Sequence, residues 1–484
     1  MNKLFGFLLS GLFLTGCAMG PDYRRPPIAV PDQVRGQVGA AEAASLADRV
    51  WWEIFPDETL RTLIGVALVN GYDVRLAAAR VEEARALAGI ARSAFFPQAQ
   101  YGGQWSRTRG SEETAGDGAT VNANAVNVGA SWELDLWGRI RRSNEAALAG
   151  YLATEEARRG VLLSLVSEVA TRYFELRELD RELDIAKRTT DALQQTYDLF
   201  RRRFEAGRAS GLETSSAEAS LANVAGRVPQ LESRIVALEN EINLLLGKNP
   251  GEISRGAALT EQFLPPEVPP GLPSELLLRR PDLRQAEQRL VAANAEVGVA
   301  VADFFPRISL TGAFGGVSSD VSNLFGAGKT WSIAAGLVGP LFTGGRLKNQ
   351  YDVRAAQWEQ AKVAYERAVT SGFSEASSAL VAHERLERAE EQQARTVAAY
   401  QDAVRLSRER YLAGLASYLD VLQAEQQLFP AENALAQVRF NRLANFVQLY
   451  KALGGGWKVE DPSWLRSGMS GSPQKRTIET GIGR

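Results

Sequence analysis

Few residues in this chain have the side chains that catalysis and metal binding usually need. The 484 residues include one histidine, His383, and one cysteine, Cys17. His383 stands in a long helical pattern near Glu384 and Glu387, far in sequence from any nucleophile signature. No group of residues has the spacing of metal ligands. The sequence therefore predicts no catalytic residue, no metal site and no enzyme activity, with an exported enzyme as a remote alternative.

One short motif resembles a phosphate-binding loop but lacks its context. Gly326-Ala327-Gly328-Lys329-Thr330 matches the end of that motif, yet Asn323 stands where its first glycine belongs. The motif also requires a helix after the lysine, whereas a strand pattern follows here. We therefore interpret residues 326–330 as a loop that connects two strands.

The N-terminus has the pattern of an export signal. Lys3 supplies a positive charge, and residues 4–14 form an apolar run that is too short to span a bilayer. The run ends in Leu14-Thr15-Gly16-Cys17, which resembles the bacterial lipobox. This resemblance implies that residues 1–16 are a lipoprotein signal peptide and that Cys17 carries a covalent lipid. An ordinary signal peptide with an incidental cysteine is the alternative.

The single cysteine and the net charge restrict the possible disulfides, location and partners of the chain. Since Cys17 is the only cysteine, the exported chain has no disulfide and its stability must come from packing. Ala18 follows it where an aspartate would favour the inner membrane, so the motif favours the outer membrane. The net charge of −2 gives no reason to expect a nucleic-acid partner.

Two short turns carry residues that we expect at a partner interface. Gly207 and Gly414 each close a helical hairpin at a position that favours a positive φ. Polar residues flank both turns: Arg203 and Ser210 at the first, Arg410 and Ser417 at the second. The sequence predicts either that these tips dock a partner or that the residues serve the turns alone.

Acidic residues and leucines follow both turns. Those that could form a gate are Leu419, Asp420 and Glu425 after the second turn and Glu213 after the first. Rings of carboxylates and leucines could attract cations and constrict a pore mouth. Acids are also favoured at helix starts by the helix dipole, so a solvated helix start is the alternative.

The elements that position these residues occur twice. Phe95-Phe96-Pro97 returns 209 residues later as Phe304-Phe305-Pro306, and Gly138-Arg139 returns 207 residues later as Gly345-Arg346. A repeat of this length is a duplicated structural half rather than a short solenoid unit. The fold should therefore have an internal pseudo-two-fold relation.

Each half contains one predicted β-hairpin. Residues 100–108 and 126–134 form the first, and residues 308–314 and 331–337 the second, because apolar and polar or small residues alternate there with period two. The strands are long enough to cross a membrane when tilted, although a sheet on a soluble domain gives the same pattern. Four strands cannot close a barrel, and an open edge cannot face lipid. In a membrane, several chains would have to share one barrel.

Each half also contains a predicted long helical hairpin. Residues 140–204 lack proline and carry heptad-spaced apolar residues over roughly 100 Å. Residues 347–412 and 418–453 form the second hairpin, and a helix after residues 207–211 completes the first. We expect Pro229 and Pro430 to kink the two returning helices.

The segments follow from these patterns. After the signal peptide we expect an N-terminal arm and equatorial segment (17–71) and a first repeat (72–247). A Pro/Gly-rich connection (248–280), a second repeat (281–454) and a mobile polar tail (455–484) follow.

At this point the sequence resembles the TolC-type outer-membrane efflux proteins, in particular the lipid-anchored NodT/OprM-like branch. The matching segments include LTGCAMGPDYRRP, WWEIFPDETLRTLI, SWELDLWGRIRR, ADFFPRISL, GPLFTGGR and RYLAGLASYLDVL, in family order between residue 14 and about residue 454. Together these motifs are highly specific, whereas any one alone is weak.

The resemblance implies the fold class and the function. It implies an α+β membrane protein in which three copies share a twelve-stranded β-barrel and a twelve-helix periplasmic α-barrel. Such a homotrimer is the outer-membrane duct of a tripartite, RND-type pump that exports drugs or other small molecules. A periplasmic adaptor protein would meet the tips, and an inner-membrane transporter would supply energy. A lipid-anchored coiled-coil scaffold is the alternative.

The resemblance is incomplete at the gate. The family pattern often places an aspartate four residues after the constricting leucine and a basic residue three further on. Gln423 and Gln426 stand at those positions here. The acidic–basic gate locks therefore cannot be carried over, and Leu419 with Asp420 is the substitute that we expect.

Overall fold

A computed structural model describes most of the chain in two compact units. It describes residues 18–31, 49–111, 118–262 and 273–455, together with residues 35, 46 and 113. Unit 1 comprises residues 1–28, 79–156 and 285–367, and unit 2 comprises residues 29–78, 157–284 and 368–484. The predicted signal peptide, Cys17 and residues 456–484 of the predicted tail lie outside the described residues.

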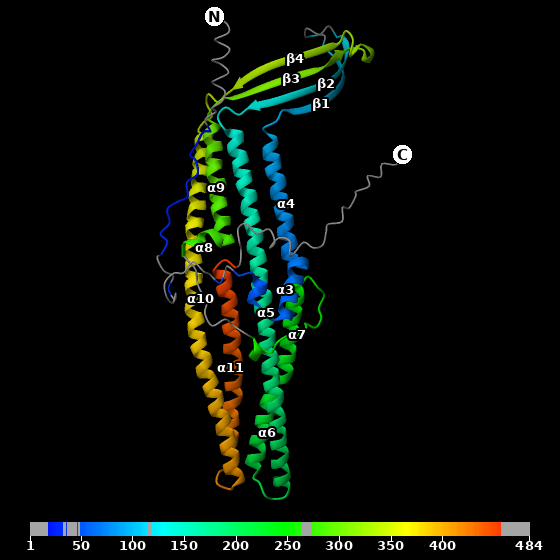
Figure 1. Cartoon of the computed structure of the whole chain (residues 1–484). Helices are drawn as coiled ribbons and strands as arrows, with labels where there is room; N and C mark the ends of the chain where they lie inside the picture. Colours follow the sequence, from blue (N-terminus) through cyan, green and yellow to red (C-terminus); the bar gives the residue numbers. More distant parts are fainter. Residues whose placement is uncertain are drawn as a thin grey trace. The chain divides into compact units, whose positions relative to one another are not determined.

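Unit 1 contains one four-stranded antiparallel sheet in the order β1-β2-β3-β4 (Figure 1). The strands are β1 (Gln98–Arg109), β2 (Thr120–Leu134), β3 (Arg307–Ser318) and β4 (Lys329–Val338). Both predicted hairpins are confirmed, and the middle pair, β2 and β3, joins the two halves. A 3-10 turn, η3 (Val321–Asn323), lies in the loop before β4, so residues 326–330 connect strands as expected.

Large side chains on one face of this sheet are exposed in the single chain. Tyr101 is 90% exposed and Ile333 is 82% exposed. Glycine is needed where the strands approach most closely, because a Cβ on Gly315 would lie 2.1 Å from the Val126 carbonyl oxygen. The sheet therefore presents apolar side chains that this chain by itself does not cover.

The long helices match their predicted bounds closely. They are α5 (Arg139–Glu205) and α10 (Arg346–Leu412), each of 67 residues. Shorter helices precede the two hairpins, namely α4 (Tyr72–Ser93) and α9 (Pro281–Ala302). No helix among the described residues has both the length and the apolar character that a membrane crossing requires.

The two returning helices differ in their continuity. In the first half the break falls at Gly226, between α6 (Gly211–Ala225) and α7 (Arg227–Leu245), and Pro229 lies in the first turn of α7. A proline ring clashes with the carbonyl four residues earlier, so the helix ends upstream of Pro229 itself. In the second half α11 (Tyr418–Ala452) continues through Pro430 without a break.

The main hydrophobic core lies in unit 2. It joins the middle of α5, the end of α11 and the short helices α2 (Trp51–Ile54) and α3 (Glu58–Asn70). Its fully buried side chains include Tyr173, Leu176, Phe446 and Tyr450. The remaining elements are η2 (Leu259–Glu261) and α8 (Pro273–Arg279), which lie within the connection between the halves. This core replaces the disulfides that the chain lacks.

Candidate functional site

The two helix tips have the same backbone geometry. Gly207 has φ +69° and Gly414 has φ +73°, as the sequence predicted. At the first tip the Arg208 N–H donates to the Arg203 carbonyl at 2.7 Å, and at the second the Leu415 N–H donates to the Arg410 carbonyl at 2.8 Å. These are glycine-terminated helix ends that satisfy carbonyls left without helical partners. A Cβ on either glycine would meet no other atom within 4 Å, so only backbone conformation requires glycine there.

The predicted acids Glu213 and Asp420 cap the helices that follow the tips. The Glu213 carboxylate accepts the Ser210 N–H at 2.9 Å, and the Asp420 carboxylate accepts the Ser417 N–H at 2.9 Å. Each serine and acid three residues later form a reciprocal capping box. These contacts belong to a helix start, so the carboxylates are already engaged in the single chain, and their role in a gate stays a prediction.

The other gate candidates have different surroundings. Leu419 is about half exposed, whereas the Glu425 carboxylate is largely buried and pairs with Arg408 at 2.7 Å. This pair holds α10 to α11. Gln423 and Gln426 stand where the family pattern has an acid and a base. In this chain Glu425 and Arg408 form an acid–base pair at other positions.

Polar contacts also link the first hairpin to the second. The Arg203 guanidinium donates to the Tyr411 hydroxyl and lies over its ring, 5.9 Å from the centroid. The Gln426 side-chain amide donates to the Ser220 hydroxyl at 3.1 Å. These links show that a predicted docking residue, Arg203, also holds the two tips together.

An aromatic cluster lies beneath these links. Tyr418 packs against Phe200, with ring centroids 4.4 Å apart, and against Tyr411 at 5.5 Å. Burial raises the pKa of Tyr418 to about 12. Sequence reasoning missed Tyr411 and Tyr418, although Tyr411 precedes the Gly414 turn by three residues and its aromatic ring was the available signal.

The N-terminal arm is fixed from its first described residue. Ala18 lies against Gly138, where a Cβ would come within 2.7 Å of the Ala18 Cα. The Met19 N–H donates to the Trp137 carbonyl at 3.0 Å. Arg142, whose side chain is 5% exposed, pairs with Asp22 at 2.7 Å. The residue after Cys17 therefore packs at the junction between β2 and α5.

The arm continues along α9 of the second half. The Arg25 guanidinium binds both oxygens of the Glu287 carboxylate at 2.6 and 2.7 Å. The Tyr23 hydroxyl donates to the same carboxylate at 3.2 Å. Burial and the Glu287 charge raise the pKa of Tyr23. The start of the predicted N-terminal arm is thus docked against both halves within unit 1.

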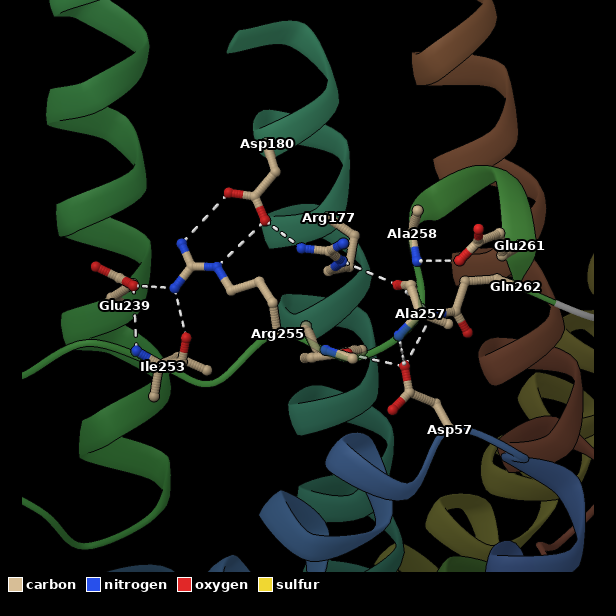
Figure 2. Close-up of polar contacts among 12 residues, drawn as sticks. Asp57, Arg177, Asp180, Glu239, Ile253, Arg255, Ala257, Ala258, Glu261 and Gln262 are labelled. Carbon is tan, nitrogen blue, oxygen red and sulfur yellow. Dashed lines mark hydrogen bonds and ion pairs between the residues drawn. The ribbon is translucent and has the colours of Figure 1, made fainter. Parts of the chain in front are cut away.

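A buried network holds the start of the connection between the halves in unit 2 (Figure 2). Asp57 caps α3 by accepting the Thr59 N–H at 2.9 Å, and its second oxygen accepts from the Tyr173 hydroxyl at 2.8 Å and the Ala257 N–H at 3.1 Å. Burial opposes ionisation, but hydrogen bonds from Gln262 and Tyr173 outweigh it and lower the pKa of Asp57.

Arg255 forms the other half of this network. It pairs with Asp180 of α5 at 3.2 Å and with Glu239 of α7, which in turn accepts the Ile253 N–H at 3.1 Å (Figure 2). Arg177 donates to the Ala257 carbonyl at 3.0 Å. These contacts hold the backbone of residues 253–257 against α5 and α7.

His383 lies beside an ion-paired arginine, Arg442. It is half-buried in α10, and burial together with the nearby Arg442 lowers its pKa. Arg442 pairs with Glu387 at 2.8 Å and Glu390 at 2.9 Å. Within the described part of the chain, no cluster of three or more potential metal-ligating side chains occurs.

Comparisons with known proteins agree on one class. The sequence model described as "Outer membrane efflux protein" matches residues 63–248 and 272–455, which are parts of both halves. The cation efflux system protein CusC of Escherichia coli is 36% identical over 462 residues, covering 94% of this chain and 99% of that protein. The probable efflux pump outer membrane protein TtgC of Pseudomonas putida is 35% identical, covering 94% and 96%.

A solved structure has the same fold. The open state of the Neisseria gonorrhoeae MtrE outer membrane channel superposes with a TM-score of 0.83 at 34% identity, covering 91% of this chain and 99% of that one. Because the match extends over both halves, it includes the sheet and both helical hairpins.

Proposed function

Since this chain belongs to the outer membrane efflux protein family, it is an outer-membrane channel component of a tripartite efflux system, and we propose that it works as a passive homotrimeric duct for drugs or other small molecules. The observation that carries this proposal is that each half supplies one β-hairpin and one long helical hairpin. Copies of such a chain can wall a pore in which the strands share a sheet and the helices form a periplasmic tunnel.

Reconstitution in planar bilayers tests the duct. The purified full chain is expected to give discrete, long-lived conductance steps. In a strain that lacks its own channel, the protein should restore resistance to small toxic compounds when an RND-type transporter and its adaptor are present. Absence of pores from the parent protein and from Leu419→Ala or Asp420→Ala variants would favour a lipid-anchored scaffold instead.

The adaptor partner is proposed at the tips. Gly207 and Gly414 give the two tips one shape, and Arg203 and Arg410 give them positive charge. A periplasmic adaptor with repeated helical ends could therefore bind both tips in the same manner. Crosslinking from cysteines placed at Ser210 and Ser417 to the adaptor checks this contact, and equal crosslinking from a mid-helix position such as Arg395 would contradict it.

Lipid attachment at Cys17 is also proposed. Its support is the lipobox and the fixed position of Ala18 beside Gly138, at the end of β2. Lipid there would lie next to the strands rather than at the end of a long tether. Cys17→Ser should block lipid labelling and leave the precursor uncleaved by the lipoprotein signal peptidase. Normal lipid incorporation in that variant would contradict the assignment. We expect partial loss of export, because membrane-spanning strands anchor more strongly than one lipidated terminus.

The gate is proposed near the tips. Leu419 would constrict the pore, and Asp420, with Glu425 and Glu213 as substitutes, would form a ring of carboxylates. Since like charges repel, a bound cation should favour the closed form. In single-channel recordings, Leu419→Ala should widen the resting pore and Asp420→Ala should weaken block by divalent cations. If block instead depends on Glu425 or Glu213, the duct stands and the residue assignment changes.

A further inference from the structure

The starts of the two long helices are equivalent in the internal repeat, and both lie in unit 1. Moving Arg139 forward by 207 gives Arg346, and moving Arg141 forward by 207 gives Lys348. The first pair lies in the first turn of α5 and the second pair in the first turn of α10. Each helix start thus has two cations at matching positions.

In the first half, carboxylates of the chain itself neutralise these cations. The two oxygens of Glu133 accept hydrogen bonds from Arg139 at 2.9 and 2.7 Å. The Asp135 carboxylate pairs with Arg141 at 3.2 Å and also accepts the backbone N–H groups of Ile140 and Arg141. The start of α5 is therefore already bound to two anionic groups.

The second half has neither carboxylate. The residues equivalent to those two acids are Pro340 and Phe342. Arg346 donates to the neutral side-chain oxygen of Gln350 at 3.1 Å. No carboxylate among the described residues pairs with Arg346. The guanidinium that is matched in the first half is thus left with an uncompensated charge in the second.

The second cation of α10 remains accessible as well. The Lys348 side chain is 74% exposed, and it pairs with Asp352 at 2.8 Å. An exposed pair of this kind contributes little to stability. An ammonium group also has three donors. Lys348 can therefore bind a further anion without a large loss.

A cavity of about 600 Å³ lies beside Arg346, between α9 and α10. Two other charged residues line it, and both have partners: Arg354 pairs with Glu296 at 3.2 Å, and Asp303 pairs with Arg307 at 2.9 Å. Among the described residues that line the cavity, Arg346 is therefore the cation without a carboxylate partner. The cavity is open to an anionic group from outside the chain.

Large apolar side chains precede these cations. Leu341 is 102% exposed and Phe342 is 91% exposed. They lie between the end of β4 at Val338 and the start of α10 at Arg346. In an outer-membrane channel with a periplasmic helical extension, the place where strand gives way to helix is the periplasmic boundary of the membrane. Apolar side chains beside cations at such a boundary suit the acyl chains and the phosphate of a lipid.

Resting on the membrane-crossing strands proposed above, we propose that residues 341–348 bind an anionic phospholipid, such as phosphatidylglycerol, in the periplasmic leaflet. Its phosphate binds Arg346 and Lys348, where the first half has carboxylates. Its acyl chains cover Leu341 and Phe342. Its uncharged headgroup enters the cavity, where the Asn349 amide can hydrogen-bond to its hydroxyl groups. A zwitterionic lipid fits less well, because its own cation lies beside the two of the protein.

Lipid titration of the purified full-length protein tests this site. Native mass spectrometry with dioctanoylphosphatidylglycerol gives an apparent Kd for the parent and for each variant. Arg346→Gln and Lys348→Gln should each weaken the affinity about fivefold, because each removes one cation from the phosphate. Lys329→Gln is the matched control, since it removes an exposed cation at the opposite end of β4 and should leave the affinity unchanged. Dioctanoylphosphatidylcholine should bind the parent more weakly.

A substitution at Phe342 tests the same site without removing a cation. Phe342→Asp supplies the carboxylate that Asp135 has in the first half, so it should abolish the preference for the anionic lipid. Phe342→Asn removes the ring without adding a charge and should keep that preference. Circular dichroism and the oligomeric state in detergent check that the variants fold as the parent does.

The outcomes separate the lipid site from the duct. Equal affinity of the parent, Arg346→Gln and Phe342→Asp for the anionic lipid would overturn the site, as would an equal loss in Lys329→Gln. Thermal stabilisation by inorganic phosphate that matches stabilisation by the lipid would also overturn it, because a free anion would then suffice. In either case the duct stands if these proteins conduct in planar bilayers. Absence of pores from the parent counts against the proposed function, whatever lipid it binds.

Discussion

The two halves share their tips but differ in what holds the rest of each hairpin. Both tips have a glycine with positive φ and a serine whose backbone N–H donates to an acid three residues later. Beyond them, the first returning helix breaks at Gly226, whereas the second is continuous for 35 residues. Turn geometry thus stayed the same after duplication, while helix continuity and polar anchoring diverged. The common features are those that a partner could meet twice.

The largest difference in stability between the halves is expected from Asp57, whose buried hydrogen bonds anchor only the first half. Asp57→Ala removes a helix cap and leaves the buried Tyr173 hydroxyl and Ala257 N–H without an acceptor, which should cost about 3 kcal/mol. Glu375→Ala in the second half should cost less, because Arg280 keeps Asp282 and the Ala452 carbonyl. Thermal unfolding followed by circular dichroism compares them, and equal losses would contradict the contrast.

Asp57 should also make stability depend on pH. Its pKa is lowered in the folded chain, so its stabilising contribution is present above the ordinary carboxyl pKa and disappears as pH falls through the lowered value. The parent should lose stability on acidification more steeply than Asp57→Asn. Identical acid profiles for both proteins would show that Asp57 is not the group responsible.

A second pH effect should distinguish the two long helices. Glu178 of α5 is buried, and burial with the neighbouring Glu182 raises its pKa to about 8, whereas Arg385, 207 residues later, is exposed. Folded chains then hold a proton that unfolded chains release, so stability should fall as pH rises from about 4.5 to about 8. Glu178→Gln should flatten this decline, and Arg385→Gln should not. A decline that survives in Glu178→Gln would refute the assignment.

Substitutions of Gly207 and Gly414 test the turn geometry that the two halves share. Gly207→Val and Gly414→Val force a β-branched residue into the left-handed region, at about 1–2 kcal/mol each. Adaptor crosslinking should fall in each variant, and further in the double variant, while trimers persist. Gly89→Val is a control, because a side chain at Gly89 also meets open space but has no positive φ. Unchanged crosslinking in the double variant would mean that the tips only close the helices.

The smallest expected effect separates capping from gating. Asp420→Asn keeps an oxygen that can accept the Ser417 N–H but loses the charge, whereas Asp420→Ala loses both, at about 1 kcal/mol for the lost cap. A gate predicts that both variants weaken divalent block. A helix cap alone predicts that only alanine lowers stability and that neither variant changes block. Glu213→Gln and Glu213→Ala repeat the comparison in the first half.

Local and repeated patterns were the predictable part of this fold. Strand alternation predicted both hairpins. Proline-free heptads predicted α5, and the internal repeat predicted α10, each to within about one residue of its ends. The kink expected from Pro229 corresponds to a break at Gly226, three residues upstream, and the sequence pattern did not place the break at that residue. A proline acts on the preceding turn, and a glycine there is the weakest point.

Contacts between distant segments could not be predicted from the sequence. Asp57 and Tyr173 are 116 residues apart, and neither stands in a motif that specifies the other. Arg408 and Glu425 belong to adjacent helices, but their pairing depends on how α10 and α11 rotate against each other. The sequence located the acids near the tips, but it did not show that Glu213 and Asp420 already accept backbone N–H groups of their own chain.

The docked N-terminal arm has a consequence for the order of folding. Arg25 and Glu287 are 262 residues apart, so closing that loop costs entropy on the order of 5 kcal/mol if the intervening chain is unstructured. The cost is much smaller once the first repeat has formed and has already brought the segments together. The segment that is synthesised first is therefore expected to dock among the last, and protease resistance of the arm would report completion of unit 1.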